Sequence, residues 1–498
     1  MTQEPDTTTV VIGLEIHVEL ATATKMFCRC LNRFGDPPNT HVCPVCLGLP
    51  GALPVMNRQA VEHALRVGLA LGCRAGEFTK WDRKSYYYPD LPKNYQISQY
   101  DLPLSADGAW EAPLPDGRSK RVGIIRAHLE EDAGKNVHDY PAHTGVDLNR
   151  AGVPLLEIVT APDLNGTDEV MAFARSMQRL VRWLGASEAN MQMGHMRFEP
   201  NISLWVGDGS RVSDPQAGWF TPIFEVKNLN SFRALARTCE WVIAFHRQQL
   251  DERGRAWSLD EVGKQNWGWR DDLGACEFQR GKEEAHDYRY FPEPDLVPVT
   301  VDSAWRQGVA ESIGELPIAR KARYVSQYDL TDKEADALTQ DAATGDLLDA
   351  AVGAGAEPKR CVNLLLGRGA AIANERGCAI AGIGVAAEAL AELATMLVEG
   401  KVNATAADKI FDQMVASGAS PGEIASTEGL LAVSDAGQIA AWVDAAIAAN
   451  PQAAEDVRAG GKKQKKAFGF LTGQVMQLSR GAASPAEVQK LLRERLGG

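Results

Sequence analysis

An acidic residue, Glu157, stands in the middle of a short apolar run, and this position limits the possible folds more than any other. Leucine, isoleucine and valine flank it within residues 155–159, and Pro154 and Pro162 bound the run. Such a run predicts a buried strand. Because burial of an unpaired charge is costly, the carboxylate needs a basic partner, a raised pKa or a bound cation. The pattern favours a functional acid.

Three more acids precede this strand in the triplet Glu130, Glu131 and Asp132, which is followed by Gly134 and Lys135. Carboxylate oxygens are hard ligands of the kind that suits Mg²⁺. The alternative for the triplet alone is a solvated turn.

The segment Leu14–Leu20 alternates between apolar and polar residues, which predicts a strand with one charged face. Residues two apart on a strand share a face, so Glu15 and His17 lie side by side. Such a pair can bind a cation or move a proton. A strand with one solvated face is the alternative.

Two pairs of closely spaced thiols predict a structural zinc site. Cys28 and Cys30 are followed, after twelve intervening residues, by Cys43 and Cys46. Four thiolates complete a tetrahedral zinc site and leave no open position for catalysis. The alternative is four unligated, reduced cysteines. The odd total of nine cysteines, without a secretory signal, does not indicate a disulfide framework.

The 498-residue chain is long enough for two to four domains, and its 23% charged residues are typical of a soluble globular protein. No apolar run approaches the roughly 18–20 residues of a membrane span. The N-terminal residues 1–9 are polar and acidic rather than a signal peptide. We therefore expect a cytoplasmic protein.

The charge is uneven along the chain. A net charge of −13 argues against general electrostatic binding of nucleic acid, but residues 451–498 hold nine Lys or Arg against four Asp or Glu. Lysines before a predicted helix form an anion site that an RNA backbone would fit. These lysines are Lys462, Lys463, Lys465 and Lys466. A solvated lysine run is the alternative.

Two further segments are candidates for substrate contacts. Residues 80–101 interleave bases with aromatic residues, a composition able to stack on nucleobases and neutralise phosphates, although the tyrosines can instead pack on the core. Glu225 and Lys227 share one face of a predicted strand. They could meet a metal–nucleotide complex, but a cross-strand ion pair is the simpler explanation.

Prolines and composition predict a division of the chain. Pro292, Pro294 and Pro298 make a stiff connection, and the sequence after Ser303 is alanine-rich with helical periods. We expect a helical second half that ends in a separate small bundle.

Seven motifs, in order along nearly the whole chain, carry a resemblance to a known family. They are Val11–Leu20, Asp82–Asp90, Leu129–Lys135, Asp147–Arg150, Pro154–Val159, Lys227–Phe232 and Asp287–Asp295. Together they resemble the B subunit of the aspartyl/glutamyl-tRNA(Asn/Gln) amidotransferase. The resemblance implies an α+β fold with a cradle-shaped mixed α/β catalytic domain (residues 1–295), an all-helical domain (296–405) and a small helical tail domain that contacts tRNA (406–498).

The resemblance also implies an ATP-dependent carbon–nitrogen ligase. ATP would phosphorylate the side-chain carboxylate of glutamate or aspartate misacylated on tRNA(Gln) or tRNA(Asn), and ammonia would displace the phosphate. The ammonia would come through a channel from glutamine hydrolysed by the amidase (A) partner, and a small third (C) partner would brace the heterotrimer. Whether one or both misacylated tRNAs are substrates stays open.

Residue roles follow from the matching motifs. The resemblance implies a Mg²⁺–ATP site lined by Glu15, His17, Glu130, Glu131, Glu157 and Glu225. Of these, His17, Glu131 and Glu157 are expected to bind Mg²⁺. Ten residues are expected near substrate or nucleotide: Lys84, Tyr86, Lys135, Asn149, Arg150, Arg197, Lys227, Asn228, Tyr288 and Arg289. No G-x-x-x-x-G-K-[ST] loop is present, so the metal and carboxylates would position the phosphates.

The chain departs from the family pattern at two places. It has Met-Arg-Phe-Glu-Pro-Asn at residues 196–201, where the family more often has Met-Arg-Cys-Asp-Ala-Asn, and it lacks the family's Thr-Arg-x-aromatic-Asp segment around residues 266–270. These departures bear on substrate preference and on the pocket for the tRNA acceptor end. Two rival functions are a non-catalytic scaffold that delivers misacylated tRNA and a zinc hydrolase. A zinc hydrolase would need an open three-ligand site, and no second histidine cluster supplies one.

Overall fold

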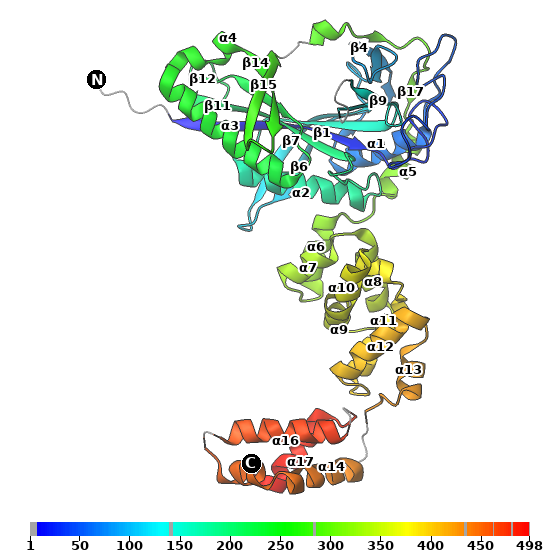
Figure 1. Cartoon of the computed structure of the whole chain (residues 1–498), viewed down its shortest axis with the longest axis vertical. Coiled ribbons are helices and arrows are strands. Elements are labelled where there is room, and N and C mark those ends of the chain that lie inside the picture. The colour runs from blue at the N-terminus through cyan, green and yellow to red at the C-terminus, as the bar shows by residue number, and fades with distance from the viewer. Residues whose placement is uncertain are drawn as a thin grey trace, which may run out of the picture. The chain divides into compact units, whose positions relative to one another are not determined.

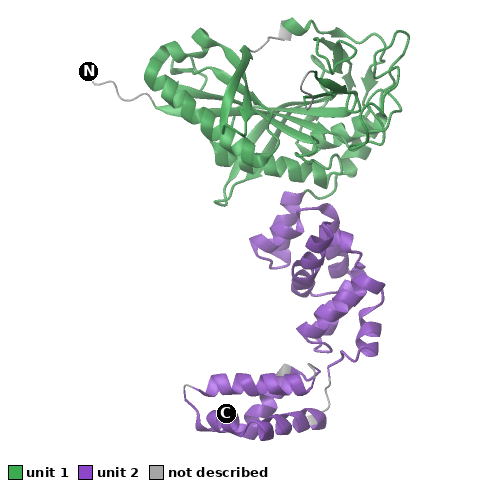
Figure 2. Ribbon diagram, in the orientation of Figure 1, with its two compact units in different colours: residues 1–316 green, residues 317–498 purple. Residues whose placement is uncertain are grey.

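The computed structural model describes residues 7–138, 143–281, 285–432, 436–461, 463–479 and 482–497. The chain divides into two compact units, Met1–Leu316 and Pro317–Gly498 (Figure 2). A large sheet with helices forms the first unit, and helices and loops form the described part of the second, so the predicted α+β fold is confirmed (Figure 1). Among the described residues, no helix is both long and apolar enough to cross a membrane.

A ten-stranded sheet forms the centre of the first unit, with β1 (Thr8–Glu19) in its interior. The strand order is β15-β14-β13-β11-β1-β10-β7-β6-β2, and β12 pairs with β11. The other strands are β2 (Arg74–Ala75), β6 (Ser105–Pro113), β7 (Ser119–Glu131), β10 (Pro154–Thr160), β11 (Met196–Gly207), β12 (Gly218–Phe220), β13 (Ile223–Lys227), β14 (Lys264–Arg270) and β15 (Ala275–Gly281). The two neighbours of β1 come from far along the chain, so the sheet brings distant motifs together.

The register places charged residues of β1 opposite those of its neighbours. His17 faces Glu157 of β10, and Glu157 faces His128 of β7, while Glu15 faces Glu199 of β11. Residues directly opposite each other in a ladder point to the same side of a sheet. These five side chains therefore share one polar face.

Helices α2 (Thr167–Trp183) and α3 (Phe232–Arg253) cover the opposite, apolar face (Figure 1). Ile16 of β1 points to that face and is fully buried. Phe224 of β13 packs against Phe245 of α3, with ring centroids 5.9 Å apart. Burial of apolar side chains between this face and the two helices stabilises the sheet. The polar side chains lie on the other face.

Smaller elements complete the first unit, and two of them join separate sequence motifs. Arg83 of β4 donates to both carboxylate oxygens of Glu293 after β16, at 2.7 and 2.8 Å, which fastens residues 82–90 to residues 287–295. The remaining elements are α1 (Arg58–Ala70), α4 (Leu259–Val262), α5 (Ser303–Glu311), β3 (Phe78–Thr79), β4 (Asp82–Ser85), β5 (Tyr95–Ser98), β8 (Lys135–Val137), β9 (Gly145–Asp147), β16 (Phe291–Pro292), β17 (Val299–Thr300), and the short helices η1 (Gly209–Arg211), η2 (Gly254–Trp257) and η3 (Ala285–Tyr288).

The second unit contains two separate apolar cores. The first includes residues from Tyr324 to Ala425, and the second includes residues from Ile439 to Leu496. Helices α12 (Ala404–Ser417) and α13 (Pro421–Thr427) contribute Phe411 and Ile424 to the first core. Packing therefore groups these two helices with the preceding ones, whereas the predicted tail domain begins at residue 406.

The helices of this unit have the following bounds: α6 (Pro317–Gln327), α7 (Asp332–Leu338), α8 (Ala342–Gly353), α9 (Pro358–Leu364), η4 (Leu365–Gly369), α10 (Ala370–Arg376), η5 (Ile380–Ile383), α11 (Ala387–Val398), α12 (Ala404–Ser417), α13 (Pro421–Thr427), α14 (Ala436–Ala449), α15 (Pro451–Ala459), α16 (Gln464–Leu478) and α17 (Pro485–Leu496).

Candidate active site

The polar face of the sheet gathers His17, Glu130 and Glu157 into one cluster. Nε2 of His17 lies 3.5 Å from Oε2 of Glu157 and 3.7 Å from Oε1 of Glu130. One ligand atom from each residue lies within 4.8 Å of the others, and both carboxylates are buried. A nitrogen and two carboxylate oxygens in this arrangement can hold a divalent cation.

The protonation states of this cluster reflect its burial and its charges. Burial opposes ionisation of Glu157, but the imidazoles of His128 and His17 hold its pKa well below the usual range. Burial would lower the pKa of His17, but contact with Glu157 and the charge of Glu199 raise it to about 9. Burial, followed by the charge of Glu157, raises the pKa of Glu130 to about 7. Without a cation, a positive charge on His17 therefore balances the acids around it, and a bound cation would displace that proton.

A second cluster lies on the same face and consists of Glu15, Glu199 and Glu225, with one carboxylate oxygen of each within 4.8 Å of the others. Nζ of Lys227 lies 3.0 Å from Glu225 and 3.2 Å from Glu199. Nδ1 of His17 lies 3.9 Å from Oε1 of Glu199, so His17 stands between the two clusters. The face can therefore accommodate two cations.

The residues fit a divalent cation in their donor chemistry. Nδ1 of His17 is buried and makes no hydrogen bond to the described residues. Oxygen and imidazole donors suit Mg²⁺, Mn²⁺ or Zn²⁺ better than a monovalent ion. The predicted acids Glu15, Glu130, Glu157 and Glu225 all supply carboxylate oxygens to the two clusters.

The structure does not bring Glu131 into either cluster, so its predicted role as a Mg²⁺ ligand needs correction. Strand alternation turns Glu131 to the other face of β7 from Glu130. Its carboxylate pairs with Lys93 and accepts a hydrogen bond from the backbone nitrogen of Ile97 at 3.0 Å. In an acid triplet, sequence alone does not fix which neighbour faces the site, and the structure places Glu130 in the cluster.

A third group of charged residues, Glu19, Asp132, Arg150 and Arg197, lies at the end of the same face. Asp132 is held by Arg197 at 2.8 Å and by Arg150 at 3.6 Å. Arg150 also donates to the backbone oxygen of Gly134 at 2.7 Å. Burial, followed by the charge of Asp132, raises the pKa of Glu19 to about 8. The predicted Arg150 and Arg197 therefore organise acids beside the two acidic clusters.

The aromatic and basic segment predicted for substrate contact borders the first cluster. Burial would lower the pKa of Lys84, but the charge of Glu130 raises it above its usual range. Nζ of Lys84 lies 5.1 Å from the ring centroid of Tyr288, whose ring lies 6.2 Å from that of Tyr86. Asn228 after β13 and Arg289 after η3 are both exposed.

The four predicted zinc ligands come together. One sulfur from each of Cys28, Cys30, Cys43 and Cys46 lies within 4.8 Å of the others, and the last two sulfurs are 3.8 Å apart. Tetrahedral zinc with bonds of about 2.3 Å requires sulfurs about 3.8 Å apart. The fully buried Lys25 donates to the backbone oxygen of His41 at 2.7 Å, which places a positive charge beside the thiols.

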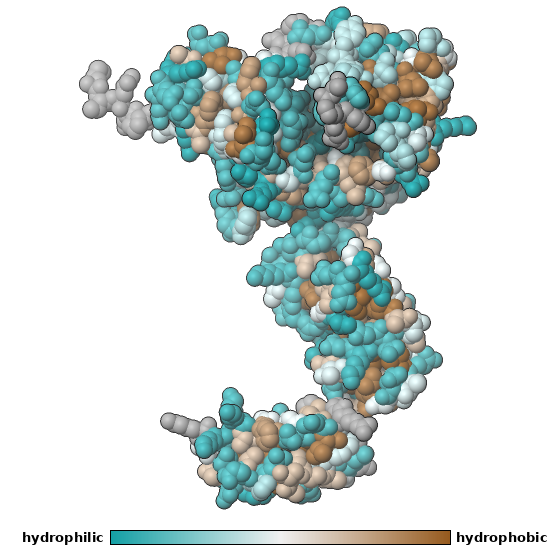
Figure 3. All heavy atoms as spheres, in the orientation of Figure 1, coloured by the Kyte–Doolittle hydropathy of each residue, from teal (hydrophilic) through white to brown (hydrophobic). Residues whose placement is uncertain are grey.

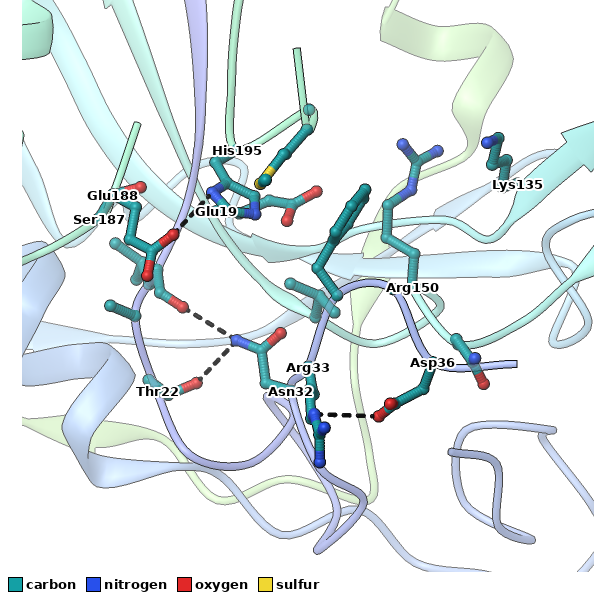
Figure 4. A pocket seen from close by; sticks show the side chains of 18 of the residues that line it. Glu19, Thr22, Asn32, Arg33, Asp36, Lys135, Arg150, Ser187, Glu188 and His195 are labelled. Carbon is teal, nitrogen blue, oxygen red and sulfur yellow. Dashed lines mark hydrogen bonds and ion pairs between the residues drawn. The ribbon is translucent and has the colours of Figure 1, made fainter. Parts of the chain in front are cut away.

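Asn149, which we expected near substrate, anchors the loop between the cysteine pairs. Its Oδ1 accepts a hydrogen bond from the backbone nitrogen of His41 at 2.8 Å, and its Nδ2 donates to the backbone oxygen of Pro37 at 2.8 Å. Residue 149 thus fixes the cysteine loop next to the polar face. Lys135 on β8 is exposed and lines a pocket there (Figure 4).

Three of the four predicted tail lysines lie at the start of α16, and Lys462 falls outside the described residues. Lys463 is the residue before the helix, while Lys465 and Lys466 belong to its first turn. All three lie at the surface. The helix N-terminus and the lysine charges point to the same class of ligand, an anion.

Sequence reasoning missed His128, Glu199 and Glu19 as members of the site. Nε2 of His128 lies 3.7 Å from Oε2 of Glu157, and burial lowers the pKa of His128 to about 4. His128 precedes Glu130 by two residues, and Glu19 follows His17 by two. The two-residue spacing that placed Glu15 and His17 on one strand face also predicts His128 beside Glu130 and Glu19 beside His17. Glu199 stands at the first departure from the family pattern.

Comparisons with known proteins identify the family of the chain. A family model described as the GatB/GatE catalytic domain matches residues 10–307, and one described as the GatB domain matches residues 346–496. The first unit is thus a catalytic domain of the GatB/GatE class.

Three relatives, each named as the B subunit of an aspartyl/glutamyl-tRNA(Asn/Gln) amidotransferase, match almost the full length. The one from Carboxydothermus hydrogenoformans is 42% identical over 98% of both chains. Those from Moorella thermoacetica and Anaeromyxobacter sp. are 44% and 43% identical over 98% of this chain and 99% of theirs. The chain belongs to the family of aspartyl/glutamyl-tRNA(Asn/Gln) amidotransferase B subunits, which confirms the resemblance.

Proposed function

We propose that, within a tRNA-dependent amidotransferase, this chain holds the site where the misacylated amino acid is phosphorylated and amidated. A side-chain carboxylate oxygen of the glutamyl or aspartyl group attacks the γ-phosphorus of ATP, and ADP leaves. The nitrogen of ammonia then attacks the acyl carbon, phosphate leaves, and the nitrogen loses a proton. The product is the amide on tRNA(Gln) or tRNA(Asn).

The observation that carries this proposal is the pair of acidic clusters on one sheet face. His17, Glu130 and Glu157 are the proposed ligands of one Mg²⁺, and Glu15, Glu199 and Glu225 are a candidate set for a second. When bound, Mg²⁺ supplies positive charge that stabilises the transferring phosphoryl group.

Two lysines support binding of a nucleotide at these clusters. Lys84 lies near Glu130, and Lys227 contacts Glu199 and Glu225. Each ammonium can pair with phosphate oxygens once a nucleotide competes for it. Tyr86 and Tyr288 form an aromatic edge beside Lys84. The exposed Asn228 and Arg289 are proposed to contact the incoming substrates.

A structural zinc ion is part of the proposal. Four sulfurs at zinc-like spacing and the hydrogen bonds of Asn149 support a metal that fixes the loop over residues 28–46. The ion would stabilise the loop and take no part in the chemistry, because four thiolates fill its coordination sphere.

The proposed partners are the amidase, which supplies ammonia, and the small third protein of the heterotrimer. Exposed apolar side chains support a partner contact on the first unit: Val297 is 82% exposed, Val55 74% and Leu53 63%. Figure 3 shows hydrophobic residues on the visible surface of this unit. Exposed apolar groups that lie together are typical of protein interfaces.

The tRNA is the remaining proposed ligand, and its contact away from the reacting end is assigned to Lys463, Lys465 and Lys466. A tRNA substrate also supports the cytoplasm as the compartment. We retain three domains as a proposal, with the tail bundle defined by the second apolar core of the helical unit.

A non-catalytic scaffold is the less favoured function. A protein that only delivers tRNA has no need to bury Glu130, Glu157 and Glu225 on one sheet face, because such burial is costly without a cation or base.

The test is reconstitution of the chain with the amidase and the small third protein, followed by conversion assays on misacylated tRNA(Gln) and tRNA(Asn). We expect amide formation on at least one of these two tRNAs, and this reaction should require ATP, Mg²⁺ and glutamine. Failure of an assembled complex to convert either tRNA would exclude the proposed reaction.

A further inference from the structure

A pocket of about 980 Å³ opens at the end of the polar face, next to the metal clusters. Glu19 and Arg150 line it, together with residues 32–36 of the cysteine loop, residues 187–188 and residues 191–195 (Figure 4). Asn149 and Lys135 also line it. Through Glu19, which follows His17 by two residues on β1, the pocket borders the polar face.

Glu19, which lines this pocket, has one unsatisfied carboxyl oxygen. Its Oε1 is buried and has no hydrogen-bond partner among the described residues. The neighbouring Asp132 is already held by Arg197 and Arg150. A buried carboxyl oxygen without a donor is costly, so a ligand that donates hydrogen bonds fits this position, and a positive charge on that ligand would favour the ionised form of Glu19.

The spacing along β1 relates this oxygen to the metal cluster. Glu19 and His17 lie two residues apart on the same face, and side chains so placed are about 6.5 to 7 Å apart. In a glutamyl or aspartyl group, the α-nitrogen lies roughly 4 to 5 Å from the side-chain carboxyl carbon. One amino acid can thus reach Glu19 with its amine while its carboxylate meets the cluster of His17, Glu130 and Glu157.

We propose that this pocket receives the acylated 3′-terminal nucleotide of the tRNA and that Glu19 binds the α-ammonium of the esterified amino acid. This inference rests on the proposed function. The ammonium donates to Oε1 of Glu19, and this contact directs the side-chain carboxylate toward the metal cluster. Glu19 is then a positioning residue that recognises an amino acid by its amine.

The wall of the pocket offers a surface for the terminal base. The ring of Phe34 lines the pocket, is 62% exposed, and meets the ring of His195 edge-on at 5.9 Å. Exposed aromatic rings stack on nucleobases without regard to sequence. The cysteine loop that carries Phe34 is tied to residues 147–149, so the ring is held in place.

The experiment compares two substrates in the reconstituted complex. One is glutamyl-tRNA(Gln), and the other is the same tRNA carrying a glutaryl group, which is glutamate without its amine. Aspartyl and succinyl esters of tRNA(Asn) replace them if that is the tRNA converted. Wild-type protein is expected to prefer the amine-bearing substrate in kcat/KM by about tenfold to a hundredfold, the range of a hydrogen bond to a charged group. Glu19→Gln is expected to bring this preference to within about threefold.

The matched control is Glu188→Gln, which changes an acid that is 77% exposed in the same pocket and should leave the preference intact. Phe34→Ala should raise the KM for both substrates about tenfold, as loss of base stacking would, and Phe34→Tyr should restore it.

A wild-type preference near unity, or a preference unchanged in Glu19→Gln, overturns the inference. If Glu19 had only a structural role, Glu19→Gln would lower kcat/KM for both substrates equally and leave their ratio unchanged. These outcomes leave ATP-dependent conversion of the natural substrate in place, whereas absence of that conversion in the wild type counts against the proposed function itself.

Discussion

His17 and Glu157 are direct partners across the antiparallel pair of β1 and β10, with Nε2 and Oε2 3.5 Å apart. The acid that stands alone in an apolar strand thus meets a histidine from a strand far earlier in the chain. Neither residue would be stable there without the other or a cation. This pair organises the proposed reaction centre, and the predictions below start from it.

Glu130 and Glu131 should behave differently when each is changed to glutamine. Glu130→Gln removes a proposed ligand, so the Mg²⁺ concentration for half-maximal amidation should rise about tenfold or more. Glu131→Gln breaks a buried pair with Lys93, so it should lower the free energy of unfolding by about 3 to 5 kcal/mol and leave the Mg²⁺ dependence unchanged. Mg²⁺ titrations and urea unfolding check both. If Glu131→Gln raised the required Mg²⁺ concentration and Glu130→Gln did not, Glu131 would be the ligand instead of Glu130.

Purified protein should contain close to one zinc per chain. Changing Cys28, Cys30, Cys43 and Cys46 together to serine should remove the metal and lower the Tm of the first unit by several degrees, because zinc binding contributes to folding. Elemental analysis and calorimetry measure the two effects. Cys378→Ser, at an exposed cysteine outside the quartet, is the control. Metal-free protein of unchanged stability would refute the zinc site.

The tail lysines should affect tRNA binding more than catalysis. Lys463, Lys465 and Lys466 changed together to alanine should raise the KM for misacylated tRNA several-fold with little change in kcat, because a remote contact contributes mostly uniform binding. The triple arginine variant keeps the charge and serves as the control. An unchanged KM would remove this surface from the proposed tRNA contact.

His246 should make stability depend on pH. Burial lowers its pKa from 6.5 to about 3, and its Nδ1 accepts from the indole of Trp257 at 3.1 Å. Between these two pH values the unfolded chain binds a proton that the folded chain does not, so stability falls as pH falls. His246→Gln keeps an acceptor and does not titrate.

The measurement for His246 is urea unfolding followed by tryptophan fluorescence, because ten of the eleven tryptophans precede residue 317. Wild-type protein should lose up to about 1.4 kcal/mol more per pH unit than the variant between pH 6 and 4. If the free energies of unfolding of the two proteins changed equally with pH, His246 would not be held neutral in the folded protein.

Much of the site follows from local patterns in the sequence. Alternation on β1 and the apolar run around Glu157 identify two strands of the polar face, and the cysteine spacing identifies the thiol cluster. The sequence does not fix which strands are neighbours, so His128 and Glu199 were missed, although each is opposite a residue that was found.

Other features depend on tertiary packing that no local pattern carries. Glu131 was misassigned because adjacent acids differ only in the face that the strand gives them. Asn149 stays a predicted neighbour of the substrate, but its hydrogen-bond partners in the cysteine loop, over 100 residues away, could not be predicted from the sequence. The place of α12 with the preceding helices depends on a shared apolar core that an alanine-rich sequence does not reveal.

The most direct measurement is the rate of ATP- and glutamine-dependent conversion of misacylated tRNA by the reconstituted complex containing Glu157→Gln. Glu111→Gln, at an exposed acid on β6 of the same sheet, is the control. We predict that Glu157→Gln lowers this rate by about 100- to 1,000-fold, as expected for lost stabilisation of transition-state charge, while glutamine hydrolysis by the amidase partner continues. A folded, assembled Glu157→Gln complex that converts misacylated tRNA at a near wild-type rate would show that the active site lies elsewhere.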